Sequence, residues 1–103
     1  PTPPTAIFAR TDVLAIGAIR EARNMGLSIP QNLSVIGHDD LSILPLAEPG
    51  LTTVRIDCTE LAKAAAEMLS GLLRNPDTDP EPKVISTSLV MRQTAAPTPR
   101  AAD

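Results

Sequence analysis

The stretch Ser34-Val35-Ile36-Gly37-His38-Asp39-Asp40 decides the fold of this chain. Its apolar part, Val35-Ile36-Gly37, is typical of the end of a buried strand, and two carboxylates follow it at once. In an open α/β sheet, ligands bind outside the carboxyl ends of the strands. The position of Asp39 and Asp40 therefore predicts polar contacts in a small-molecule cleft.

A second strand is predicted over Thr5–Ala9, an apolar run that is typical of a strand buried on both faces. It also ends in polar residues, Arg10-Thr11-Asp12. A side-chain oxygen of Thr11 or Asp12 can cap the helix predicted over Val13–Met25, because it satisfies free N–H groups at the helix start. Two strand ends that deliver hydrogen-bonding groups to one edge make a stronger candidate site than either alone.

The rest of the chain completes an α/β pattern. We expect a third strand over Leu51–Ile56, a second helix from Asp57 or Thr59 to about Leu73, and one or two strands within Val84–Gln93. The order strand–helix–strand–strand–helix–strand predicts a mainly parallel sheet with flanking helices. We predict one folded segment over residues 1–94 and a disordered tail over residues 95–103.

The composition excludes several classes of protein. The chain has 103 residues, a net charge of −3 and one aromatic residue, Phe8. A negative chain with scattered arginines lacks the basic surface of a nucleic-acid-binding protein. One aromatic residue is too few for a self-contained sugar-stacking site or for a base-stacking site. A single cysteine, Cys58, rules out an internal disulfide. We expect Cys58 to serve as a small buried apolar residue.

The chain shows no membrane-targeting feature. No apolar run approaches the ~20 residues of a membrane-spanning helix. The segment Pro1-Thr2-Pro3-Pro4 lacks the charged and apolar regions of a signal peptide. We therefore expect a soluble cytoplasmic protein with no membrane partner.

Catalysis and metal binding find no support in the sequence. His38, Asp39 and Asp40 are adjacent, and adjacent residues at a strand end point in different directions, which disfavours a metal site. No Ser-His-Asp order, glycine-rich phosphate loop or metalloprotease motif occurs. We expect no cofactor and no enzymatic activity. His38 can act as a pH switch, but packing of its ring is the favoured interpretation.

Several blocks of sequence carry a resemblance to a known family. They are Pro4–Ala9 with Thr11-Asp12 and Ala15–Ala18; Gly26, Ile29-Pro30 and Leu33–Asp40; Leu51–Val54; and Leu89–Arg92. Together they resemble the C-terminal part of the ligand-binding region of LacI/GalR transcription regulators, from Pro4 to about Thr94. The resemblance implies a helix-turn-helix head and a two-lobed, periplasmic-binding-protein-like (type I) sensor, of which this chain would be the last third.

The resemblance assigns roles to particular residues. Asp39 matches the acidic residue that bonds effector hydroxyls, and Thr11 stands where the family usually has an asparagine that also contacts the effector. A hydroxyl has one donor and a shorter reach than an amide, so Thr11 implies an altered effector preference. Asp12 matches the aspartate that starts the following helix. Asp12 and Asp40 are expected to be helix-capping or structural, Asp40 by accepting from backbone N–H groups of its loop.

The resemblance also implies a homodimer. It places the first helix and the loop after Asp40 at the interface between two copies. The residues concerned are Val13, Ile16, Gly17, Leu44, Leu46 and Ala47. Exposed apolar patches of this kind usually mark association, and the alternative is that these residues fill the core of the chain itself.

The sequence thus predicts the C-terminal fragment of a sugar- or metabolite-responsive transcription regulator. Its part would be effector binding and dimerisation, and DNA would be bound only through a missing N-terminal domain. The main alternative is a periplasmic solute (sugar) binding protein of a transporter, which has the same sensor fold without a DNA-binding head. A doubly wound enzyme, with its nucleophile or cofactor loop upstream, is the remaining alternative.

Overall fold

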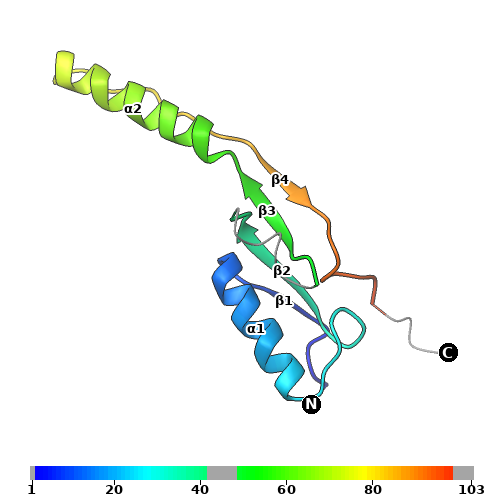
Figure 1. Ribbon diagram of the computed structural model, residues 1–103. Coiled ribbons are helices and arrows are strands. Elements are labelled where there is room, and N and C mark those ends of the chain that lie inside the picture. The colour runs from blue at the N-terminus through cyan, green and yellow to red at the C-terminus, as the bar shows by residue number, and fades with distance from the viewer. Residues whose placement is uncertain (1, 42–48, 99–103) are drawn as a thin grey trace. The chain divides into compact units, whose positions relative to one another are not determined.

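The computed structural model describes residues 2–41 and 49–98. Along the chain lie β1 (Ala6–Phe8), α1 (Asp12–Asn24), β2 (Ser34–Asp39), β3 (Thr52–Ile56), α2 (Cys58–Arg74) and β4 (Thr87–Val90). The four strands form one sheet in the order β1-β2-β3-β4. β1 and β2 pair in parallel, as do β2 and β3, whereas the β4 arrow runs opposite to β3 (Figure 1). The predicted α/β fold with a mainly parallel sheet is confirmed.

The chain divides into two compact units. The first consists of Pro1–Arg55 with Ser88–Asp103, and the second of Ile56–Thr87. Within the described residues, no helix is long and apolar enough to cross a membrane. The candidate site and the core described next belong to the first unit.

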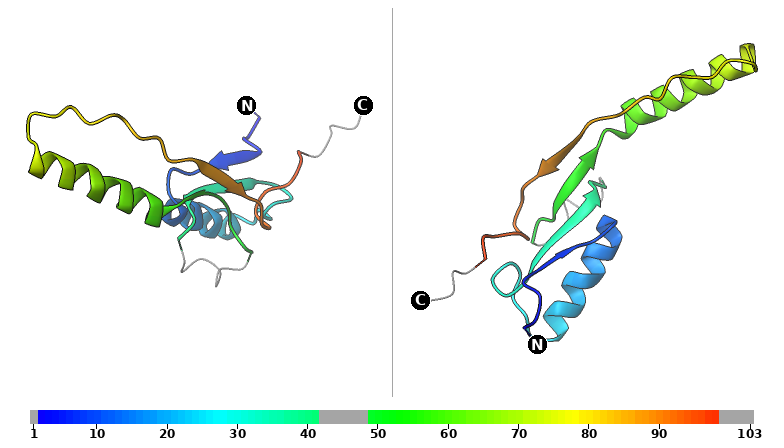
Figure 2. Two further views of the ribbon diagram at one scale, coloured as in Figure 1. Left: turned by 90° about the horizontal axis from the view of Figure 1, so that it is seen from above. Right: turned by 180° about the vertical axis from the view of Figure 1, so that it is seen from behind.

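The core of the first unit lies between α1 and one face of the sheet (Figure 2). Ala15, Ile19 and Ala22 of α1 are spaced by three or four residues, so they share one helix face, and all three are buried. They pack with Val35 of β2 and with Leu51, which are fully buried. Helical spacing on one side and strand alternation on the other therefore explain why these two elements meet.

β1 is an exposed edge strand, contrary to the expectation that it is buried on both faces. Ala6 and Phe8 are exposed, and Ile7 is half-buried because it faces the core. The physical reason is its place in the sheet: β1 is the first strand in the order, and among the described residues it has a hydrogen-bonded neighbour, β2, on one side only. Its apolar composition is that of an inner strand, and a further strand could pair with its open edge.

The segment after β4 is anchored in the sheet. Thr94 is fully buried, and its Oγ1 donates to the Val35 carbonyl at 2.6 Å and accepts from the Thr52 N–H at 2.9 Å. Ala96 exchanges two hydrogen bonds with the Ser34 hydroxyl. Hydrogen bonds to β2 thus reach at least to Ala96, which lies within the segment predicted as a tail. Residues 99–103 of that tail lie outside the described residues.

The second unit is dominated by α2. Asp57 caps it, with its carboxylate accepting from the Glu60 N–H at 2.9 Å. Ala64 is the buried residue of this helix, while Leu61, Leu69 and Leu73 remain exposed. Cys58, in the first turn, is also exposed, so the expectation of a buried Cys58 is wrong. Cys58 comes six residues before Ala64, which places it on a different side of α2 from that buried residue.

Candidate functional site

A hollow of about 500 Å³ lies at the carboxyl ends of β1 and β2. Phe8, Arg10, Thr11, His38 and Asp39 line it. The parallel register pairs Phe8 with Ile36, so both strands end at the same edge of the sheet. The structure thus brings together Thr11 and Asp39, the two residues that the sequence analysis assigned to effector contact. Hollows of this size take small molecules.

Thr11 caps α1 from the edge of this hollow. Its backbone is extended, with φ −138° and ψ 157°, and its Oγ1 accepts from the Leu14 N–H at 3.2 Å. A hydroxyl that accepts one bond still has its own hydrogen to donate. Capping the helix and contacting a ligand are therefore compatible roles for Thr11. The capping residue is Thr11 and not Asp12, which is already in the first helical turn.

Asp39 reaches the hollow from a strained backbone. Its φ is +116°, and that of Asp40 is +57°, in the left-handed region that favours glycine. His38 Nδ1 lies 3.1 Å from Asp39 Oδ1, and both side chains are about one-third exposed. Oδ2 of Asp39 has no hydrogen-bond partner in the described part of the chain. Strain of this kind persists where a site needs a side chain in a particular place.

Two aromatic rings form the apolar part of the hollow. The rings of Phe8 and His38 meet edge to face, with centroids 6.4 Å apart and an interplanar angle of 86°. The sequence analysis did not assign Phe8 or Arg10 to the site. Their positions could have indicated the site, because Phe8 is the last residue of β1 and Arg10 is among the polar residues that follow that strand. Only the register with β2 shows that these residues and His38 share one hollow.

Asp12 is a buried residue that links elements of the fold next to the site. It is fully buried, and its carboxylate accepts from the Thr53 hydroxyl at 2.5 Å and from the Leu41 N–H at 3.0 Å. It thereby joins the start of α1 to β3 and to the chain after Asp40. A Cβ at Gly37 would overlap its Oδ1 atom. Gly37 therefore lacks a side chain because the Asp12 carboxylate occupies that space.

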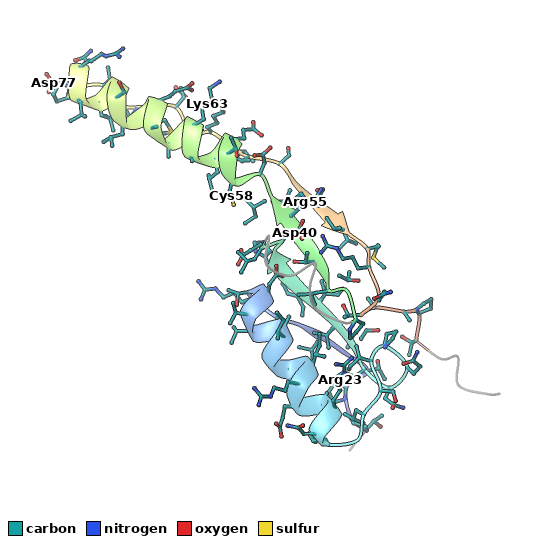
Figure 3. The ribbon with its side chains drawn as sticks, viewed as in Figure 1. Arg23, Asp40, Arg55, Cys58, Lys63 and Asp77 are labelled. Atoms are coloured by element: carbon teal, nitrogen blue, oxygen red, sulfur yellow. The ribbon has the colours of Figure 1, made fainter. Side chains whose placement is uncertain are left out.

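Asp40 pairs with two arginines. Arg55 Nε and Arg92 Nη2 lie 2.7 and 2.8 Å from its two carboxylate oxygens, and Asp40 and Arg55 are labelled in Figure 3. Arg92 also donates to the Leu51 carbonyl at 2.8 Å. The sequence analysis expected Asp40 to accept from backbone N–H groups of its loop. The arginines instead supply stronger, charge-assisted bonds, and they come from β3 and from the segment after β4.

The arginine pair changes the titration of Asp40. Burial alone raises the pKa of this carboxyl, but the hydrogen bonds and charges of Arg55 and Arg92 outweigh burial and hold the pKa below its ordinary value of 3.8. A carboxyl whose pKa is lower in the folded state stabilises the fold above the unfolded-state pKa. That contribution is lost as the pH falls through the lowered pKa.

Replacing Asp40 by Asn is therefore expected to lower the free energy of unfolding at pH 7 by about 1–2 kcal/mol, a value reduced because Arg55 is largely exposed. The difference from the unsubstituted protein should shrink below pH 3.8, where the native carboxyl also becomes neutral. Urea unfolding at pH 7 and pH 3 measures both values. Asp79→Asn, at an exposed position, is the control. A difference that stays constant with pH contradicts the assignment.

The predicted dimer residues on α1 form an exposed patch. Val13 and Ile16 are 62% and 37% exposed, and Gly17, the residue after Ile16, is exposed as well. These residues do not fill the described core, which was the alternative. Leu44, Leu46 and Ala47 lie outside the described residues. Among residues 2–41 and 49–98, no group of three or more His, Cys, Asp or Glu side chains is arranged to hold a metal ion.

Comparisons with known proteins agree on one kind of molecule. Residues 1–95 match the profile of the periplasmic binding protein-like domain family. The ribose operon repressor of Haemophilus influenzae is 36% identical over 90 residues, which are 87% of this chain. A LacI family transcriptional regulator from Enterococcus faecium with bound ribose superposes with a TM-score of 0.84 at 31% identity, over 95% of this chain and 37% of that one.

A second solved structure extends the comparison to another ligand. The complex of the transcriptional regulator CelR with cellobiose superposes with a TM-score of 0.82 at 28% identity, over 88% of this chain and 28% of that chain. The present chain spans about a quarter of the curated relatives' length, 27% in the case of the ribose operon repressor.

Proposed function

Because this chain belongs to the periplasmic binding protein-like domain family, and because its relatives are LacI-family regulators, we propose that it is the C-terminal segment of a sugar-responsive, DNA-binding transcription regulator. The resemblance inferred from the sequence is thereby confirmed. The observation that carries the proposal is the meeting of Thr11 and Asp39 in one hollow at the strand ends. The relatives described above are regulators, which favours this role over that of a transporter's solute-binding protein or of an enzyme.

The lining of the hollow has the chemistry that a sugar needs. The Asp39 carboxylate accepts hydrogen bonds from sugar hydroxyls, and the Thr11 hydroxyl donates one. The bonds to the Asp39 carboxylate are charge-assisted, and such bonds are short and strong. The rings of Phe8 and His38 supply apolar surface for the carbon skeleton. These contacts support reversible binding of a sugar.

In the longer protein, residues 1–94 would form part of the effector-binding and dimerisation domain, and a cytoplasmic location follows from the DNA target. Upstream residues would supply the remaining parts of the sensor and the DNA-binding head. The effector would shift an equilibrium between two arrangements of the sensor by binding one of them more tightly. That shift would change how two DNA-binding heads are spaced. No cofactor enters this mechanism.

The proposal is tested with the longer protein and an operator DNA selected from random sequence. Adding sugars one at a time should change the affinity for that DNA, and one or more should do so at least 10-fold. The segment by itself should not retard the same DNA at physiological salt. DNA binding by the segment, or sugar-independent DNA binding by the longer protein, contradicts the proposal.

Dimerisation gives a separate prediction. Val13→Glu should weaken self-association of the longer protein by about 100-fold, because a charge moved into an apolar interface loses roughly 3 kcal/mol of solvation. A two-fold interface repeats the charge in each copy. Val84→Glu makes the same chemical change at a residue that is 90% exposed and is not one of the patch residues, and it should have no effect. Sedimentation equilibrium measures both variants, and equal effects would remove the patch from the interface.

A further inference from the structure

Arg10 lies in the wall of the candidate site and has no partner among the residues that the structure describes. It lines the hollow together with Thr11 and Asp39, and it is exposed. Within residues 2–41 and 49–98 no hydrogen bond or ion pair involves its guanidinium. Arg55 and Arg92 in the same unit, by contrast, are both paired with Asp40. The guanidinium of Arg10 is therefore available to an occupant of the hollow.

We infer, on the basis of the function proposed above, that the effector is a hydroxylated ring that carries an anionic oxygen group, a carboxylate or a phosphate, which Arg10 binds. The planar guanidinium presents parallel N–H donors that match two oxygens of either group. Asp39 and Thr11 bond hydroxyls of the same molecule. Phe8 and His38, which line the same hollow, supply apolar contacts to its ring.

The free energy of desolvation favours this class over a neutral sugar. A neutral sugar satisfies Asp39 and Thr11 but offers no charge to Arg10. Closing a binding site around an unpaired charge is costly, because the charge gives up its hydration without compensation. An anionic group on the ligand replaces that hydration with charge-assisted bonds.

Asp39 does not neutralise Arg10 in its place. The Asp39 carboxylate lies 3.1 Å from His38 Nδ1 and makes no ion pair with Arg10, although both side chains line the hollow. The two charges are thus presented separately. An acceptor for hydroxyls stands at one position and a donor for an anion at another, which suits a ligand that has both kinds of group.

The test uses the longer protein and ligands that differ in one group. Calorimetry with glucose, glucuronate and glucose 6-phosphate, and with ribose and ribose 5-phosphate, gives each Kd. At least one anionic ligand should bind 10-fold or more tightly than its neutral counterpart. Glucuronate against glucose 6-phosphate then tells whether the group is a carboxylate or a phosphate. Neutral ligands that bind as tightly as the anionic ones in both series overturn the inference.

Two arginine variants identify the residue responsible. Arg10→Gln should abolish the preference for the anionic ligand, whereas Arg20→Gln, an exposed arginine of α1 outside this hollow, should leave it unchanged. A preference that survives Arg10→Gln overturns the inference. Asp39→Asn should weaken neutral and anionic ligands alike. If Asp39→Asn weakens neither the neutral nor the anionic ligands, or if no ligand of either series binds, the proposed function fails as well. If Asp39→Asn weakens both kinds of ligand while no anionic preference exists, only the present inference fails.

Discussion

Asp39→Ala in the longer protein is expected to weaken effector binding by at least about 100-fold, since a carboxylate that accepts from sugar hydroxyls contributes roughly 1.5–3 kcal/mol for each bond. The position supports a large effect. Asp39 is the last residue of β2, at the carboxyl edge of the sheet, and its Oδ2 has no partner among the described residues. Isothermal calorimetry with the effector measures the change. An unaltered Kd would remove Asp39 from the site.

A second substitution separates binding from folding. Asp39 holds a φ of +116°, which costs a residue with a side chain about 1–3 kcal/mol. Glycine adopts this conformation without strain but loses up to ~1 kcal/mol through greater freedom of the unfolded chain. Asp39→Gly should therefore match or exceed the unsubstituted protein in its free energy of unfolding and yet lose the effector. A large loss of stability would show that the carboxylate supports the fold rather than the ligand.

Gly37→Ala is expected to destabilise the fold by about 1–3 kcal/mol through overpacking in β2. The new methyl group would overlap Asp12 Oδ1 and would approach Leu51 Cδ2 to 3.0 Å. Gly71→Ala is the matched control, because a Cβ there meets nothing within 4 Å. Gly71 lies in the last turn of α2, where alanine still favours the helix, so the control should raise stability by up to about 0.5–1 kcal/mol. Equal effects at the two glycines would contradict the close approach at Gly37.

The double variant tests the partner of Gly37. Asp12→Ala alone leaves the Thr53 hydroxyl and the Leu41 N–H without an acceptor, at a cost of about 1–3 kcal/mol for each buried group. Without the Asp12 carboxylate, a Cβ at residue 37 no longer overlaps Oδ1. Gly37→Ala should therefore lower the free energy of unfolding less in the Asp12→Ala background than it does alone. The expected interaction energy is about 1–2 kcal/mol. Additive losses in urea unfolding would show that the two residues act independently.

Local patterns predicted the elements well. The expected helix over Val13–Met25 lies at Asp12–Asn24, and the expected strand over Leu51–Ile56 lies at Thr52–Ile56. Capping oxygens, a glycine that ends a helix and apolar periodicity are all properties of residues close together in the chain. They can therefore be recognised in a single sequence. The placement of Thr11 and Asp39 at one edge also followed, because parallel strands end on the same side of a sheet.

Contacts between distant residues were beyond local reasoning. Asp40 was expected to bond its own loop, but it meets Arg92, 52 residues further along the chain. Thr94 was expected only to end the folded segment, but it is buried beside Val35. Arg10 and Phe8 looked like the ordinary end of a strand until the register placed them beside His38. Each of these pairs depends on which strands are neighbours, and spacing along the chain does not state that.

By itself, the sequence determined the α/β class, the family resemblance and the two polar strand ends, because hydrophobic periodicity and turn chemistry act over a few residues. The resemblance also assigned Asp39 to the effector and Asp12 and Asp40 to structure, but the tertiary structure alone decided which groups each carboxylate contacts. Asp12, Asp39 and Asp40 are chemically identical, but Asp12 is buried against Thr53, Asp40 is paired with two arginines, and Asp39 lines the hollow. Burial and charge partners set the role of a carboxylate, and both arise only when the strands and α1 are brought together.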